Sequence, residues 1–340
     1  MIKNKIIWLQ YVRAIACLLV ILLHISSNYV NEFGVVGYGY WSISNAIDSF
    51  SRVCVPLFFM ISGYLFFGDK SPKAKNFFKL FSALIFYSVL AYLFYFSASI
   101  AFPSLTISEK YNFFSSPAIY HLWFFYPLIL VYLIAVIVNV RKVSTSASFI
   151  IVSIFFIFLN NSSIENVKSV FNVNLNNLFA VNSEFFFYVL YSIMGAIFRD
   201  LKYVFISKKT ASLIGVATFM LSCTAITVIT KSTSTDNNEF YSGVYTYTSP
   251  LVFMAATSLF LFFHSASERL KDSKIINIIA DNSLGIYGIH IFILICIQKI
   301  FRYQLHNPAY IVPIMFVIIL TISLSFSILI KKIDKHGFVS

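Results

Sequence analysis

Apolar blocks long enough to cross a lipid bilayer recur along nearly the whole of this 340-residue chain. Each block holds about 17–25 residues, which is the length a helix needs to span a hydrocarbon core of about 30 Å. Hydrophobic residues make up 59% of the chain and charged residues only 11%, so a water-facing exterior cannot be built from this composition. The sequence therefore predicts an all-α, polytopic membrane protein.

Polar breaks between the apolar blocks predict about ten transmembrane helices. Their expected limits are 7–29, 48–68, 77–101, 121–140, 146–160, 184–199, 211–230, 248–265, 277–297 and 310–330. External loops are expected at 30–47, 102–120, 161–183 and 231–247. Because no linker or internal repeat divides the chain, we expect one membrane-embedded domain over residues 1–340.

The distribution of Lys and Arg predicts the orientation of these helices. With the N-terminus inside, 18 of the 25 basic residues fall in segments expected to be cytoplasmic. Five are expected outside, namely Lys110, Lys168, Lys231, Lys299 and Arg302. Cytoplasmic loops carry the excess of positive charge, so both termini are expected in the cytoplasm.

Charge and cysteine usage exclude two other classes of protein. The net charge of +12 is spread over short clusters between apolar blocks rather than along one face, so no nucleic-acid partner is expected. The four cysteines lie inside apolar blocks without a CxxC pair, which indicates packing residues and no metal site.

The first apolar block carries two ionisable residues, Arg13 near its cytoplasmic end and His24 in its outer half. At 100° per residue, 11 residues return to nearly the same helix face, about 16 Å farther along the axis. An ionisable group at this depth is costly unless it is paired or hydrated, so each is a functional candidate. Either could instead snorkel or bond a neighbouring helix, but two on one stripe favour a shared function.

The second block adds Asp48 and Arg52 at a depth similar to that of His24. Their i, i+4 spacing allows an ion pair on one helix face. Pro56 removes a backbone donor and predicts a kink, and Ser62-Gly63 predicts close packing of two helices.

Four further residues are candidates. His121 opens the fourth helix and is expected at the external boundary, whereas His290 is expected near mid-membrane. Lys79 lies where the third helix leaves the cytoplasm. Glu184 begins the sixth helix, where it either lines a polar entrance or caps the helix.

Taken together, these features resemble the acyltransferase-3 family of bacterial membrane acyltransferases over nearly the whole chain. The resemblance rests on Arg13 and His24 with ten residues between them, on VPLFFMISGY at 55–64, on HLWF at 121–124, and on SLGIY at 283–287 before His290. Within the family, the proline-containing motif is most similar to the stand-alone surface-polysaccharide O-acetyltransferases of the enterobacterial common antigen type. Many relatives carry a pair of arginines where this chain offers only Lys79.

The resemblance implies an O-acyltransferase that takes an acyl group, most often acetyl, from cytoplasmic acyl-CoA. The acceptor would be a hydroxyl of a surface glycan or lipid-linked saccharide, and no cofactor would be bound permanently. A hydroxyl needs a base, and neutral His24 suits that task or could accept the acyl group itself. Arg13 would act with it. Lys79, Asp48, Arg52, His121 and His290 are assigned to substrate binding.

Two other classes of protein remain open at this point. A polysaccharide or small-solute transporter also buries Arg and His, although such proteins often show repeated halves. A non-catalytic partner in a glycan-assembly complex is the third possibility. Acyl transfer depends on Arg13 and His24 facing one connected site, and side chains aimed at lipid or at separate, unconnected cavities would refute it.

Overall fold

The computed structural model describes residues 5–101, 116–141, 144–160, 181, 183–204 and 206–339. All regular elements in these ranges are helices, and eight helical spans are long and apolar enough to cross a membrane. The α-helices are α1 (Ile7–Val30), α2 (Tyr38–Ser51), α3 (Cys54–Phe66), α4 (Ala74–Ala101), α5 (Phe125–Ile137), α6 (Thr145–Phe158), α8 (Glu184–Arg199), α9 (Lys208–Asn237), α10 (Pro250–Ser265), α11 (Lys274–Asp281), α12 (Ser283–Ile300) and α13 (Pro308–Ile333). Short 3₁₀ helices are η1 (Tyr120–Phe124), η2 (Gly243–Tyr245) and η3 (Tyr303–Leu305). The predicted all-α, polytopic fold is confirmed.

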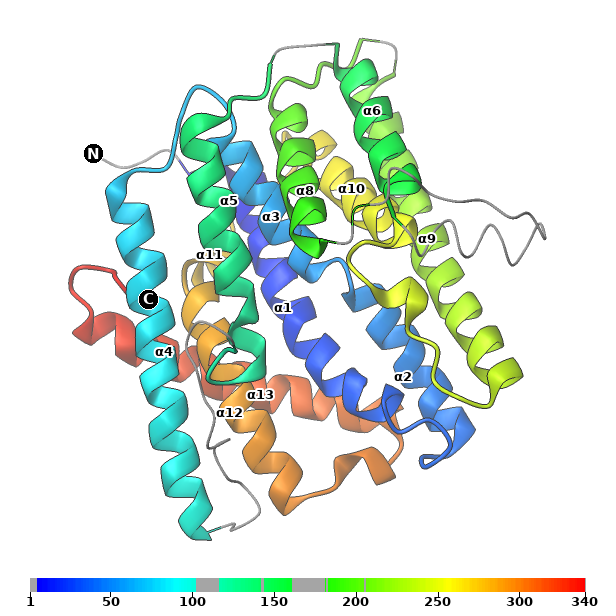
Figure 1. The fold of residues 1–340 in the computed structure, drawn as a ribbon, viewed down its shortest axis with the longest axis vertical. Helices are drawn as coiled ribbons and strands as arrows, with labels where there is room; N and C mark the ends of the chain where they lie inside the picture. Colours follow the sequence, from blue (N-terminus) through cyan, green and yellow to red (C-terminus); the bar gives the residue numbers. More distant parts are fainter. Residues whose placement is uncertain are drawn as a thin grey trace.

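Helix α1 lies at the centre of the bundle (Figure 1). It packs against α2, α3 and the four helices α10 to α13. No Gly or Pro interrupts its 24 residues, so the backbone hydrogen bonds continue across the whole span. The indole Nε1 of Trp41 donates to the Val30 carbonyl at 3.0 Å and satisfies one of the last carbonyls of the helix. The helix that carries Arg13 and His24 is therefore surrounded by protein.

The second transmembrane span begins at Tyr38, so the external loop predicted at 30–47 was too long. Its polar residues suggested a loop, but tertiary contacts satisfy them. Asn45 is fully buried, and its amide donates to the Thr227 carbonyl at 2.9 Å. The span breaks at residues 52–53, four positions before Pro56, because proline has no N–H for the Arg52 carbonyl. The kink predicted from Pro56 is observed.

Helix α9 is also longer than expected and extends into the predicted 231–247 loop. The Ser207 side chain caps its start by accepting from the Thr210 N–H at 3.1 Å. Near its other end, the Thr235 hydroxyl donates to the Lys231 carbonyl at 2.8 Å. Most of the loops predicted at 102–120 and 161–183, with Lys110 and Lys168, lie outside the described residues.

Helices α3 and α8 approach each other closely enough to require glycine on both sides. A Cβ added at Gly63 would overlap the Ser192 backbone, and one added at Gly195 would overlap the Met60 backbone. The Ser192 hydroxyl also donates to the Phe59 carbonyl at 3.2 Å. The close packing predicted for Ser62-Gly63 is confirmed, as small residues permit at membrane helix interfaces.

The outer helices present apolar side chains away from the bundle. Along α4, exposed residues recur every three or four positions and include Phe78, Phe81, Ile85, Val89, Leu93 and Phe96. Such a stripe is suited to contact with lipid. No disulfide joins any of the four cysteines. Cys17, Cys54 and Cys223 are buried, as expected of packing residues, whereas Cys296 is exposed.

Candidate active site

One end of the bundle contains a cavity of about 750 Å³ that we call the basic cavity. It is formed by α1, α3, α4, η1, α5, α11, α12, the end of α13 and the segment after α13. Its positively charged lining residues are Arg13, Lys75, Lys79, Lys331 and Lys335. Because these cations outnumber the two lining carboxylates, the cavity attracts anions.

The two carboxylates of the basic cavity already have partners. Asp281 forms an ion pair with Lys5 at 2.6 Å. Asp334 accepts backbone N–H groups of Phe338 and Val339 at 3.0 and 2.7 Å. Among the described residues, no carboxylate lies within ion-pair distance of the half-buried Arg13. Its guanidinium is thus placed to bind an anionic or carbonyl group.

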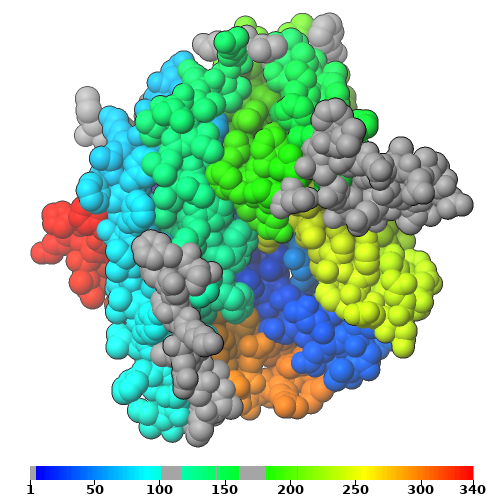
Figure 2. Space-filling view, in the orientation of Figure 1, coloured from blue at the N-terminus to red at the C-terminus, as the bar shows by residue number. Residues whose placement is uncertain are grey.

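A second cavity, of about 470 Å³, is the aromatic cavity. Its aromatic and polar lining includes His24, Arg52, Tyr120, Trp123, Glu184, Tyr188, Tyr245 and Tyr247. The Trp123 and Tyr247 rings stack with centroids 6.0 Å apart. Figure 2 shows the face on which it lies, with blue α1 visible between the green η1, α5 and α8 and the yellow segment around η2. Flat rings with a few convergent polar groups are typical of an organic ligand site.

His24 is half-buried and reaches the aromatic cavity from α1. Its ring centroid lies 5.4 Å from that of Tyr120 and 5.2 Å from that of His290. The backbone carbonyl of His24 is occupied, because it accepts from the Ser27 hydroxyl at 3.2 Å and the Asn28 amide at 3.1 Å.

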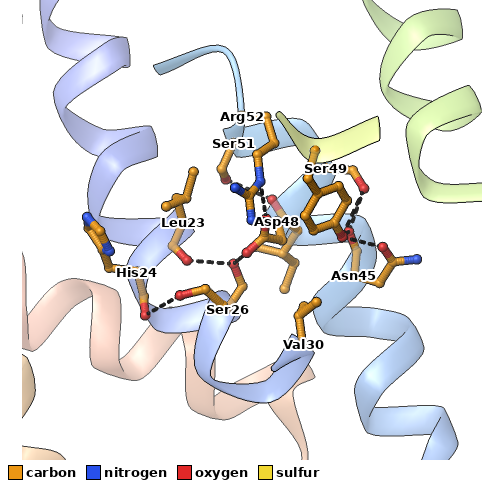
Figure 3. A network of polar contacts seen from close by, with 12 residues as sticks. Leu23, His24, Ser26, Val30, Asn45, Asp48, Ser49, Ser51 and Arg52 are labelled. Atoms are coloured by element: carbon orange, nitrogen blue, oxygen red, sulfur yellow. Dashed lines mark hydrogen bonds and ion pairs between the residues drawn. The ribbon is translucent and has the colours of Figure 1, made fainter. Parts of the chain in front are cut away.

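The ion pair predicted between Asp48 and Arg52 is present (Figure 3). Arg52 Nε donates to Asp48 Oδ1 at 2.5 Å, and Ser26 Oγ donates to Asp48 Oδ2 at 3.2 Å. Asp48 is fully buried, whereas the Arg52 side chain is 18% exposed and lines the aromatic cavity. The Arg52 guanidinium also lies 4.2 Å from the Tyr245 ring centroid. Asp48 therefore neutralises and orients Arg52, at the depth of His24 as predicted.

His121 and His290 are both 1% exposed. Their ring centroids lie 5.3 Å apart, so residues 121 and 290 meet although they are far apart in sequence. The side chain of His121, which was predicted at the external boundary, turns inward from η1 against Tyr287 and His290 and is enclosed by protein. No group of three or more His, Cys, Asp or Glu within the described residues is arranged to hold a metal ion.

Arg13 and His24 do not share one cavity, contrary to the expected connected site. The rings of Phe58, Phe124 and Tyr287, from three different elements, line the basic cavity and not the aromatic one. The two cavities nevertheless adjoin, since Phe124 lines one and its chain neighbour Trp123 lines the other.

Several site residues were missed by sequence reasoning. Lys331 and Lys335 were read only as orientation signals, yet both line the basic cavity, Lys331 from the last turn of α13 and Lys335 from the segment after it. Tyr245 and Tyr247 lie in a predicted external loop, where the recurring Tyr of VYTYTS was the available signal. Glu184 lines the aromatic cavity and accepts from the Tyr188 hydroxyl at 3.0 Å, which favours an entrance over a simple cap.

The fold and site define a multi-pass membrane protein whose central helix lines an anion-attracting cavity and an aromatic one. A sequence model of the acyltransferase-3 family, described as an acyltransferase domain, matches residues 6–331, and the chain belongs to that family. Membership indicates an acyltransferase and favours this class over a transporter. Neither a curated protein nor a solved structure matches the chain.

Proposed function

We propose that the protein is an O-acetyltransferase of the bacterial inner membrane. It transfers an acetyl group from cytoplasmic acetyl-CoA to a hydroxyl of a surface glycan or lipid-linked saccharide. The observation that carries the proposal is the placement of Arg13 and His24 on one central helix, in adjoining cavities of contrasting chemistry. Family membership supplies the acyl-transfer class.

The basic cavity suits the donor. Coenzyme A carries phosphate groups, and phosphates favour Lys and Arg side chains. Lys79 contributes from α4, while Lys331 and Lys335 contribute from the end of the chain. The positive-inside pattern of the sequence puts this end of the bundle in the cytoplasm, where acyl-CoA is made. Arg13 is the one of these cations that lies on the central helix α1, and in the proposal it holds the donor near its thioester.

The aromatic cavity suits a saccharide acceptor. The rings of Trp123, Tyr188 and Tyr247 offer apolar faces for the C–H face of a sugar ring. Glu184 and Asn31 line the same cavity and can hydrogen-bond sugar hydroxyls. Arg52 is neutralised by Asp48, so the cavity does not select for a strongly anionic sugar.

His24 would act on the hydroxyl in one of two ways. In direct transfer, its lone pair takes the hydroxyl proton while the oxygen attacks the thioester carbon, and the departing CoA thiolate takes that proton from the imidazolium. In the covalent route, the imidazole nitrogen attacks the thioester first and CoA leaves as the thiolate; the acceptor oxygen then displaces the acetyl group from His24 while its proton passes to the thiolate. Both routes require the thioester of a donor bound in the basic cavity to reach His24 in the adjoining aromatic cavity.

The function is tested with purified protein in lipid nanodiscs and with cells. Wild-type protein is expected to release CoA thiol from acetyl-CoA and to add acetyl signals to the surface glycan, measured by NMR in cells with and without the gene. Acetylation that survives both His24→Ala and Arg13→Ala would sink the assignment. Incubation with labelled acetyl-CoA but no acceptor distinguishes the routes, because only the covalent one leaves an acetyl group on His24.

A further inference from the structure

A cluster of imidazoles adjoins the aromatic cavity. His24 comes from α1, His121 from η1 and His290 from α12. The His290 ring centroid lies 5.2 Å from that of His24 and 5.3 Å from that of His121. Of the three side chains, only that of His24 lines the cavity. The arrangement places one accessible imidazole against a fully enclosed one.

The protonation pattern of the His290 ring follows from its backbone contacts. His290 Nδ1 lies 2.7 Å from the Tyr287 carbonyl oxygen and 3.2 Å from that of Ile286. Carbonyl oxygens only accept hydrogen bonds, so Nδ1 carries the hydrogen. In the neutral ring Nε2 is then a bare acceptor, and it is buried without a hydrogen-bond partner among the described residues. A buried acceptor left unsatisfied is costly and requires an explanation.

We propose that His290 is a positioning residue whose Nε2 accepts a hydrogen bond from a ring N–H of His24. A ring nitrogen lies about 1 Å from its centroid, so a bond of about 3 Å between facing nitrogens separates two imidazole centroids by about 5 Å. The observed 5.2 Å matches that separation, and the bond forms when the His24 ring turns about its own side-chain axis. The proposal rests on the proposed function, in which His24 is the reactive group.

The consequence is a fixed His24 tautomer. With one ring N–H committed to His290, the other nitrogen of His24 presents its lone pair to the aromatic cavity. When His24 gains a proton or an acetyl group, the neutral acceptor on His290 stabilises the remaining N–H. A carboxylate performs this task in many nucleophilic triads. Here Asp48 is committed to Arg52 and Ser26, and the His24 imidazole lies on the side of α1 away from that network (Figure 3).

His121 does not take this role. Its ring contacts His290 and Tyr287 but does not line either cavity. The ring nitrogens of His121 are likewise buried without a hydrogen-bond partner among the described residues, but they face neither cavity. Of the two imidazoles beside His290, only His24 can present a reactive nitrogen to a ligand, so the proposed pair is His24 with His290.

The first test measures the tautomer of His24 in the absence of catalysis. Purified protein with ¹⁵N-labelled histidine, in nanodiscs without acetyl-CoA, is studied by NMR, and the His24 signal is assigned by its loss in His24→Gln. We expect a single neutral tautomer for His24 in the wild type and a mixture in His290→Phe. The amide oxygen of His290→Gln can stand where Nε2 stands and should restore the single tautomer. An unchanged His24 tautomer in His290→Phe would overturn the proposal.

The second test is kinetic. Loss of a partner that orients a functional histidine typically costs about 10- to 100-fold, so His290→Phe should lower kcat by that factor with the KM for acetyl-CoA unchanged. His290→Gln should recover most of the rate, and His306→Gln, a histidine outside both cavities, serves as the matched control. If His290→Gln is as slow as a folded His290→Phe, the acceptor role is wrong. If the wild-type protein acetylates no acceptor, the proposed function is refuted. The His24 tautomer measured by NMR still tests the hydrogen bond to His290.

Discussion

The two cavities are built by different means. In the basic cavity, Lys75, Lys331 and Lys335 are exposed and come from helix ends and from the segment after α13. In the aromatic cavity, Tyr188 and Tyr245 are buried and come from elements that meet only in the folded bundle. Exposed charges attract a ligand through their combined electrostatic field, whereas buried side chains bind it through defined contacts. Substitutions should therefore have large, specific effects at the aromatic cavity and graded effects at most of the basic one.

The largest effect is expected at His24. His24→Ala removes the proposed base or acyl acceptor, so kcat should fall by about 100- to 10,000-fold. Acetylation of glycan is measured at saturating acetyl-CoA, with His306→Ala as a histidine control outside both cavities. If kcat falls less in His24→Ala than in a variant of the basic cavity, the contrast between the two cavities does not hold.

Arg52 is expected to matter through stability. Arg52→Met leaves the Asp48 carboxylate fully buried with only the Ser26 hydroxyl, which should lower the free energy of unfolding by about 3 kcal/mol. The double variant with Asp48→Leu removes the orphaned charge and should recover much of the loss. Thermal unfolding in detergent compares the three proteins. A double variant less stable than Arg52→Met would show that packing around the pair, not charge, dominates.

Arg13 is the exception within the basic cavity, because it lies on the central helix rather than at a loop. A hydrogen bond to a charged group contributes about 1.5–3 kcal/mol, so Arg13→Gln should raise the KM for acetyl-CoA by about 10- to 100-fold. The KM for the acceptor should stay the same. Arg269→Gln makes the same charge change at an exposed position outside both cavities and should have no effect. Equal changes in both KM values would contradict the assignment of donor and acceptor to different cavities.

Local pattern was sufficient for the helices and for the Asp48–Arg52 pair, because span length and i, i+4 spacing are properties of one segment. It failed at 38–47, where Asn45 is polar but satisfied by α9. It also placed Arg13 and His24 in one connected site. Helix geometry gives their shared stripe, but not that the other elements of the bundle form two cavities beside α1, one lined by Arg13 and the other by His24.

The aromatic cavity is the part that local pattern could not provide. Tyr245 lies in η2, and its hydroxyl donates to the Asn45 carbonyl of α2 at 3.1 Å. Tyr191, in α8, donates to the Tyr247 carbonyl at 2.8 Å and fixes the same segment. These contacts join residues more than fifty positions apart, so no periodicity in the sequence could indicate them.

Trp123 tests whether the aromatic surface binds the acceptor. Aromatic contacts contribute about 0.5–1.5 kcal/mol beyond area burial, so Trp123→Ala should raise the KM for the acceptor by about two- to tenfold. Trp123→Phe keeps a flat ring against Tyr247 and should retain most of the affinity. The KM for acetyl-CoA should not change in either variant. Loss of donor rather than acceptor affinity would reverse the proposed roles of the two cavities.

The smallest effect is expected from the exposed cations of the basic cavity. The double substitution of Lys331→Gln and Lys335→Gln removes two charges that line it, and should raise the KM for acetyl-CoA by only about two- to fivefold at low salt. In 1 M salt, where the screening length is about 3 Å, the difference should vanish. Lys332→Gln is the matched control, since Lys332 is exposed on the same turn of α13 but does not line the cavity. A large effect that persists in high salt would mean that Lys331 or Lys335 makes a direct, enclosed contact with the donor, and the basic cavity would then resemble the aromatic one in depending on individual side chains.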